Sequence, residues 1–97
     1  MPQPSFEMGL DTFGDVTVDS GGRPLHHAAV LRNVIAEAVH ADVLGLDFFG
    51  VGEHHREDFA VSAPEVVLAA IVGQTSRIRV GTAVTVLTTD DPVRVYQ

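Results

Sequence analysis

Segments with the apolar pattern of strands alternate along this chain with segments that have the periodicity of helices. The strand-like segments lie at residues 6–10, 48–52 and 78–86 of the 97 residues. Between the first two, apolar residues recur at i, i+3, i+4, i+7 and i+8, which predicts a helix over 27–44 that ends at Gly45; these residues are Leu31, Val34, Ile35, Ala38 and Val39. The alternation predicts an α/β fold of parallel strands joined by right-handed crossovers.

Two further helix starts can be read from capping residues. Ser62 with Glu65 three residues later, and Pro64 in the first turn, predict a second helix that runs to about residue 75. Asp91 followed by Pro92 predicts the N-cap and first residue of a third helix, which has only begun when the sequence ends. Three strands leave sheet edges unpaired. We therefore expect residues 1–97 to be a barrel-type or doubly wound domain truncated at its C-terminus.

Composition and charge narrow the classes of partner. The net charge is −7 and all six basic residues are arginines, which argues against binding to nucleic acid or to an anionic membrane surface. The chain has no cysteine, so disulfides and thiolate metal sites are excluded. Residues 1–25 lack the pattern of a secretory signal, and the longest apolar run, 66–72, is far shorter than the roughly 20 residues that span a bilayer. A cytoplasmic location is expected.

Four ionisable residues, 53–56 with the sequence EHHR, follow the second predicted strand directly. Parallel α/β folds place ligands at the carboxyl ends of their strands. Because neighbouring residues of an extended chain point in opposite directions, one of His54 and His55 would face a ligand while the other packs elsewhere. Imidazole titrates near neutral pH and suits proton transfer or hydrogen bonding to a developing anion. An ordinary polar loop is the alternative interpretation.

The His26–His27 pair and the third predicted strand are two other features that could bind a ligand. His26 and His27 could bind a metal ion together with His54 and His55. No HExxH-like spacing is present, however, so no metal site is predicted. The small residues of the third strand, 81–85 with the sequence GTAVT, would let a flat ligand approach the backbone. Ordinary strand packing explains that segment equally well when it is viewed alone. The first strand–helix turn has no GxGxxG, which disfavours a dinucleotide-binding fold.

Taken in order, four segments resemble the bacterial luciferase-like family of flavin-dependent monooxygenases. They are FEMGLDTFGD at 6–15, GLDFFGVGEHH at 45–55, IRVGTAVTVL at 78–87 and DPVR at 91–94. The resemblance implies the N-terminal part of a TIM (β/α)8 barrel, with three parallel strands, two helices and the start of a third. A full barrel needs about 250 residues. It also implies reduced FMN, or F420 in some relatives, as a cofactor at the C-terminal mouth of the barrel.

The same resemblance assigns roles to individual residues. His54 matches the family histidine close to flavin and substrate, where it would transfer a proton or donate a hydrogen bond. Ala83 and Val84 match the pair whose peptide, cis in many members, lies against the isoalloxazine ring, and Thr85 would add a polar contact. A small organic substrate, oxygen and a separate flavin reductase are the implied partners, together with a second copy or the missing C-terminal part.

Two hypotheses follow for the activity of the chain. The first is oxidoreduction, in which paired donors are used with incorporation or reduction of molecular oxygen. The second is a non-catalytic fragment that binds flavin or associates with itself. The flavin-site interpretation requires His54 and the 83–84 stretch to converge on one hollow that holds an isoalloxazine ring.

Overall fold

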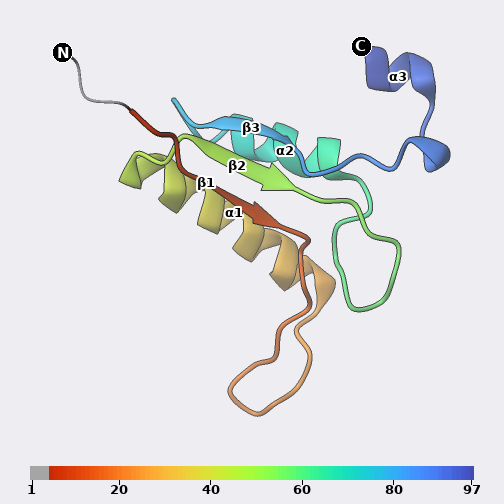
Figure 1. The fold of residues 1–97 in the computed structure, drawn as a ribbon. Coiled ribbons are helices and arrows are strands. Elements are labelled where there is room, and N and C mark those ends of the chain that lie inside the picture. Colours follow the sequence, from red (N-terminus) through yellow and green to blue (C-terminus); the bar gives the residue numbers. More distant parts are fainter. Residues whose placement is uncertain (1–4) are drawn as a thin grey trace.

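The computed structural model describes residues 5–97 as a three-stranded parallel sheet covered by helices. The strands are β1 (Gly9–Thr12), β2 (Phe48–Val51) and β3 (Arg79–Thr82), in the order β1-β2-β3 (Figure 1). In the register of this sheet, Gly50 of β2 lies opposite Asp11 of β1 and Gly81 of β3. The predicted α/β architecture of parallel strands and crossover helices is confirmed.

Helix α1 (His27–Leu44) has the bounds that its apolar periodicity predicts. It starts after His26, whose ring accepts a hydrogen bond from the backbone N–H of Ala28, and it ends at Gly45. Gly45 has a φ of 84°, a left-handed conformation that residues with a Cβ rarely adopt. The predicted stop at this glycine is therefore confirmed.

Helix α2 (Pro64–Val72) differs from its prediction at both ends. Its N-cap is Ala63, and no side chain within residues 5–97 caps it, so the predicted capping role of Ser62 is wrong. The reason is that Pro64 occupies the first helical position, which makes its immediate predecessor the cap. The helix ends at Val72, and Thr75 lies beyond it with its hydroxyl donating to the carbonyl of Ile71.

The outer strands are displaced or shortened relative to their predictions. β1 begins at Gly9 instead of residue 6 because its partner β2 begins at Phe48, while the N–H of Met8 is bound by the side chain of Asp47. β3 ends at Thr82 instead of residue 86, and the peptide between Ala83 and Val84 is cis. A 3-10 turn, η1 (Leu87–Thr89), and helix α3 (Pro92–Tyr96) follow. The predicted cap of α3 is confirmed, since the Asp91 carboxylate accepts from the N–H of Val93.

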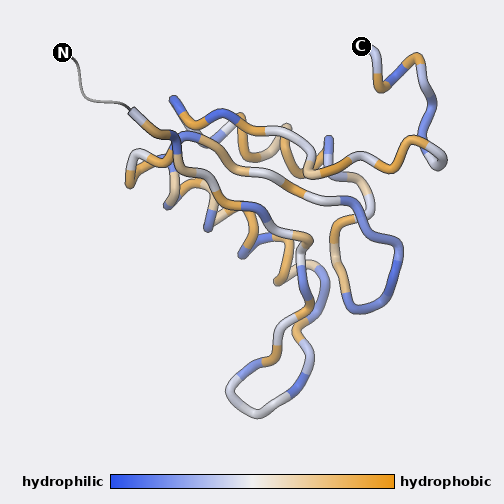
Figure 2. Tube along the Cα trace, viewed as in Figure 1, coloured by the Kyte–Doolittle hydropathy of each residue, from blue (hydrophilic) through white to orange (hydrophobic). Residues whose placement is uncertain are grey.

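The hydrophobic core lies between one face of the sheet and helices α1 and α2. Figure 2 shows hydrophobic positions recurring along both helices and a hydrophilic stretch directly after β2. The core consists of residues from the sheet, the two helices and the segments next to them: Val34, Ala38, Ala41, Phe49, Val51, Val61, Val67, Ile71 and Ile78. Phe49 and Val51 point to the helices. Because successive residues of a strand face opposite sides, Phe48 and Gly50 face the other side of the sheet. Within residues 5–97, no helix is both long and apolar enough to cross a bilayer.

Candidate functional site

The face of the sheet opposite the helices has a floor made of glycine. A Cβ atom at Gly50 would collide with the Asp11 carboxylate and would lie 3.0 Å from the Cβ of Ala83. A Cβ atom at Gly81 would lie 3.3 Å from the ring of Phe48. The missing side chains therefore leave room on β2 for groups contributed by the neighbouring strands.

Gly52 continues this floor past the end of β2. A Cβ atom there would collide with the ring of Phe13 and would lie 2.8 Å from the carbonyl oxygen of Ala83. Phe13 follows β1 and Ala83 follows β3, so the carboxyl ends of all three strands meet over Gly52. This edge is where a parallel sheet presents its ligand site.

His54 lies at this edge with its ring in contact with two phenylalanines, whose own rings contact each other. Its ring centroid is 4.8 Å from that of Phe13 and 4.4 Å from that of Phe59. Its backbone N–H donates to the carbonyl of Val61 at 2.9 Å. The ring atom Nδ1 is buried and has no hydrogen-bond partner among residues 5–97. Because buried polar atoms are nearly always paired, this nitrogen is a candidate for a hydrogen bond with a group from outside residues 5–97.

The Ala83–Val84 peptide is held against the same end of β2. The N–H of Ala83 donates to the carbonyl of Val51 at 2.9 Å, and the carbonyl of Val84 accepts from the N–H of Glu53 at 3.2 Å. Phe13 contacts the ring of His54 and lies over Gly52 beside Ala83. Three of the four predicted site residues, His54, Ala83 and Val84, therefore lie at the carboxyl end of β2 and are linked through Phe13. The hollow that His54 lines with His27 and Phe59 does not include Ala83 or Val84.

Thr85 is placed differently from these three. It lines a groove together with Thr82 of β3, Glu65 of α2 and Arg94 of α3, on the helix side of the sheet. The polar contact predicted for Thr85 stays a prediction.

Glu53 is a residue that sequence reasoning left without a role. Its side chain is 3% exposed, and its oxygens accept hydrogen bonds from the N–H of Val86 at 3.2 Å, the hydroxyl of Thr89 at 2.9 Å and Nε2 of His55 at 2.5 Å. The hydrogen bond from His55 lowers the pKa of Glu53 below its usual value, and those from Val86 and Thr89 lower it further against the opposing effect of burial. A carboxylate directly after an apolar strand needs such partners when it is buried. Its position in the sequence could therefore have indicated a structural role for Glu53.

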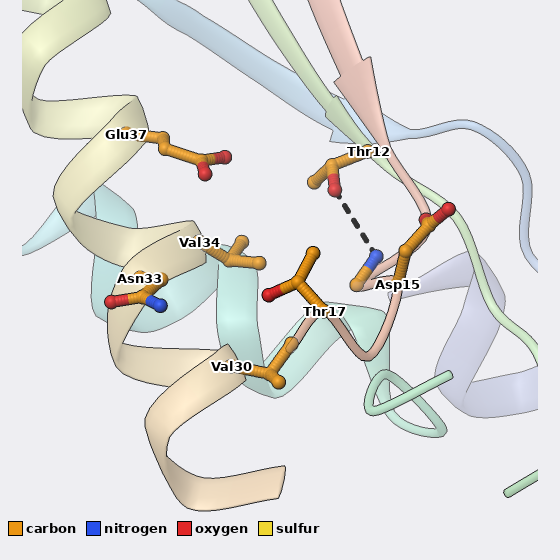
Figure 3. A pocket seen from close by; sticks show the side chains of 8 residues that line it. Thr12, Asp15, Thr17, Val30, Asn33, Val34 and Glu37 are labelled. Carbon is orange, nitrogen blue, oxygen red and sulfur yellow. Dashed lines mark hydrogen bonds between the residues drawn. The ribbon is translucent and has the colours of Figure 1, made fainter. Parts of the chain in front are cut away.

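A separate cavity of about 140 Å³ lies between α1 and the loop after β1 (Figure 3). Its wall includes Thr12, whose hydroxyl accepts from the N–H of Gly14, and Asn33 and Glu37 of α1. It contains none of the predicted site residues and opens on the helix side of the sheet. The glycine-floored edge is therefore the candidate site.

Comparison with known families decides the classification. The family model described as luciferase-like monooxygenase matches residues 12–97. The chain belongs to this family. The resemblance inferred from its four sequence segments is thereby confirmed.

Individual relatives agree with this membership. Over 69 residues the chain is 36% identical to the alkanal monooxygenase alpha chain of Photobacterium leiognathi, and over 68 residues it is 38% identical to an uncharacterised protein, y4vJ, of Sinorhizobium fredii. These matches include 70% and 69% of the chain but only 20% and 19% of those proteins. The chain therefore spans about a fifth of the curated relatives that it matches.

Two solved structures share the fold. Apo-MsnO8 superposes with a TM-score of 0.80 at 38% identity, covering 92% of this chain and 26% of that one. The oxygenating constituent of 3,6-diketocamphane monooxygenase from Pseudomonas putida, in complex with FMN, gives 0.76 at 26% identity, covering 94% and 24%. The three strands correspond to the N-terminal part of a (β/α)8 barrel, which confirms the predicted fold class.

Proposed function

We propose that this chain forms the flavin-facing part of an FMN-dependent monooxygenase that uses reduced FMN, with F420 as the alternative cofactor. The observation that carries the proposal is that Phe13, which contacts the ring of His54, and the Ala83–Val84 peptide meet over the glycine floor at the carboxyl end of β2. FMN in the Pseudomonas putida neighbour supports this choice of flavin.

The residues present fit a flat aromatic ring system. Ala83 is small, the floor at Gly50 and Gly52 carries no side chains, and the Val84 side chain is 69% exposed. The Ala83–Val84 segment would therefore hold the isoalloxazine ring, with Thr85 as a further polar contact. When bound, the flavin would supply the reaction with oxygen, which no side chain of this chain can perform.

His54 would hold or move a proton at Nδ1. The rings of Phe13 and Phe59 both contact its imidazole and lie 6.5 Å from each other, so they restrict the orientation of the ring on adjoining sides. The backbone bond from His54 to Val61 fixes the main chain at the same point. These contacts give His54 the restrained geometry that a proton-transfer group requires.

The partners that accompany this function are a small organic substrate and oxygen, with a separate flavin reductase to supply reduced FMN. Residues 1–97 would be a partial barrel domain. Among residues 5–97, β1 and β3 each have one edge without a paired strand, and further strands or another copy of the chain would complete the sheet.

Titration of FMN with the chain, followed by quenching of flavin fluorescence, tests the proposal. Wild-type chain should quench saturably, and Ala83→Leu should abolish binding because the larger side chain fills the space above Gly50. Ala69→Leu, the same change at an exposed position of α2, is the matched control and should bind normally. Absence of binding by the wild type, or equal binding by Ala83→Leu, would overturn the proposal.

A second candidate function is self-association without turnover. Near the unpaired edge of β1, the side chains of Phe6, Met8 and Leu10 are 80%, 57% and 48% exposed, and exposed apolar residues beside a free edge favour pairing with another chain. Light scattering of the purified chain distinguishes the candidates. A monodisperse monomer that binds FMN contradicts this second function.

A further inference from the structure

Glu53 connects the end of β2 to the segment that follows β3. Its N–H donates to the carbonyl of Val84, one carboxylate oxygen accepts from the N–H of Val86, and the other accepts from the hydroxyl of Thr89. These three bonds cover residues 84–89, which contain no strand and only the single turn η1. A segment without ladder hydrogen bonds needs other contacts to hold one conformation.

His55 is the fourth hydrogen-bond partner of Glu53, and its position differs from that of its neighbour His54. Its Nε2 lies 2.5 Å from the carboxylate of Glu53, while 46% of its side chain is exposed. The ring of His54 contacts Phe13 and Phe59 instead, and its Nδ1 has no hydrogen-bond partner among residues 5–97. One histidine thus serves the carboxylate, and its neighbour is left free for the candidate site.

We propose that Glu53 is a positioning residue that fixes the 83–89 segment, and with it the Ala83–Val84 peptide, in the place where a flavin ring would be received. The inference rests on the proposed function for its ligand. It rests on the geometry alone for the ordering of the segment, because three hydrogen bonds from one buried residue reach it and a fourth, from His55, holds the carboxylate in place.

Glu53→Gln tests this role with little change of shape. The amide can keep its oxygen toward the Val86 N–H, but an NH2 group then replaces the oxygen that accepts from Thr89 and His55, so both of those bonds are lost and the segment opens more easily. Native-state amide exchange at Val86, measured by NMR and corrected for global stability, should accelerate about tenfold. The nitrogen chemical shift of His55 Nε2 should also change. FMN binding should weaken by about tenfold, since the loss of a hydrogen bond to a charged group is of that size.

Thr89→Val provides a milder variant in case Glu53→Gln folds poorly. It removes one bond to the carboxylate from a side chain at the surface, so Val86 exchange and FMN affinity should change in the same direction by a smaller factor. Asp42→Asn is the matched control, because Asp42 also binds distant backbone groups but at the opposite end of the sheet. It should lower the thermal midpoint without changing the FMN dissociation constant.

The outcomes separate the two proposals. If wild-type chain binds no FMN, the proposed function fails, and the amide exchange alone decides the role of Glu53. If wild-type chain binds FMN but Glu53→Gln leaves both Val86 exchange and FMN affinity unchanged, the positioning role fails and the proposed function stands. Equal loss of FMN affinity in Asp42→Asn would show that general destabilisation, not positioning, is responsible, and would also overturn it.

Discussion

The two ends of the sheet are each tied together by one carboxylate, and the two carboxylates have different surroundings. At the amino end, Asp42 of α1 accepts from the backbone N–H groups of Ser76, Arg77 and Ile78, at 3.0, 3.0 and 2.8 Å, and so fixes the turn into β3. At the carboxyl end, Glu53 fixes the segment that leaves β3. Both bridge residues more than 30 positions apart in the sequence.

The difference lies in the partners and the burial. Asp42 accepts hydrogen bonds from main-chain donors and from the Ser76 hydroxyl near the solvent. Glu53 is buried, and one of its partners is the ring of His55, which is itself partly exposed to solvent. Main-chain donors suffice to fix a turn. A buried carboxylate beside a histidine pair is costly unless it is paired, and such groups gather at functional sites. Both carboxylates should therefore stabilise the fold, and we propose that only Glu53 also positions the candidate site.

The largest effect is expected when the buried carboxylate is removed. Glu53→Ala leaves the Val86 N–H and the Thr89 hydroxyl without their acceptor and creates a void, so the free energy of unfolding should fall by about 3 kcal/mol. Urea denaturation followed by circular dichroism measures it. A loss below that of Asp42→Ala would contradict the contrast between the two ends.

A smaller effect is expected from filling the floor of the carboxyl end. Gly52→Ala places a Cβ against the Phe13 ring and the Ala83 carbonyl, and overpacking of this kind costs about 1–3 kcal/mol. Gly73→Ala is the control, since a Cβ there would meet only carbonyl oxygens at 3.6 Å and the φ of −66° suits any residue. Thermal unfolding of both variants makes the comparison. Equal midpoints would show that the floor tolerates side chains.

Removing the carboxylate at the amino end should have the next effect in size. Asp42→Ala frees three N–H groups that water can reach, so it should lower the urea midpoint by less than Glu53→Ala does. Quenching of FMN fluorescence should be unchanged. A change in FMN affinity would show that the two ends are coupled.

Acidification should lower the free energy of unfolding through both Glu53 and Asp42, because the folded-state pKa of each carboxyl is lowered. The pKa of Glu53 is lowered from 4.5, first by the hydrogen bond from His55, and that of Asp42 is lowered from 3.8, first by the backbone bond from Ser76. A lowered folded-state pKa gives stability that is complete above the unfolded value and is lost as pH falls through the folded one. Stability should therefore decline below about pH 4.5, and Glu53→Gln should decline less steeply in urea titrations across that range.

Local sequence signals predicted the parts of the fold that depend on neighbouring residues. The α1 bounds followed from periodicity and Gly45, and the α3 cap followed from Asp91 and Pro92. The position of His54 and Ala83 at the carboxyl ends of neighbouring strands was also predictable, because residues that follow adjacent parallel strands end at one edge of the sheet. Membership of the family was recognised from the order of four short segments.

Contacts between distant residues account for what the sequence did not predict. The β-branched residues at 84–86 favour a strand, but the Val86 N–H is taken by the Glu53 carboxylate, 33 positions away, and β3 stops at Thr82. The packing of Phe13 and Phe59 on His54 likewise depends on two loops whose paths no local pattern specifies. The roles of His54, Ala83, Val84 and Thr85 toward a cofactor stay predictions.

The glycine floor restricts where new ligand preferences can arise. Gly50 and Gly52 admit no side chain without displacing their neighbours. Substitution at either position would therefore fill the space above the sheet and would not produce a new binding surface. Asp11 and Phe13, which reach over the floor from β1, are the positions where exchange of one side chain for another alters shape and polarity while the backbone stays in place. A library aimed at altered recognition would begin with those two codons.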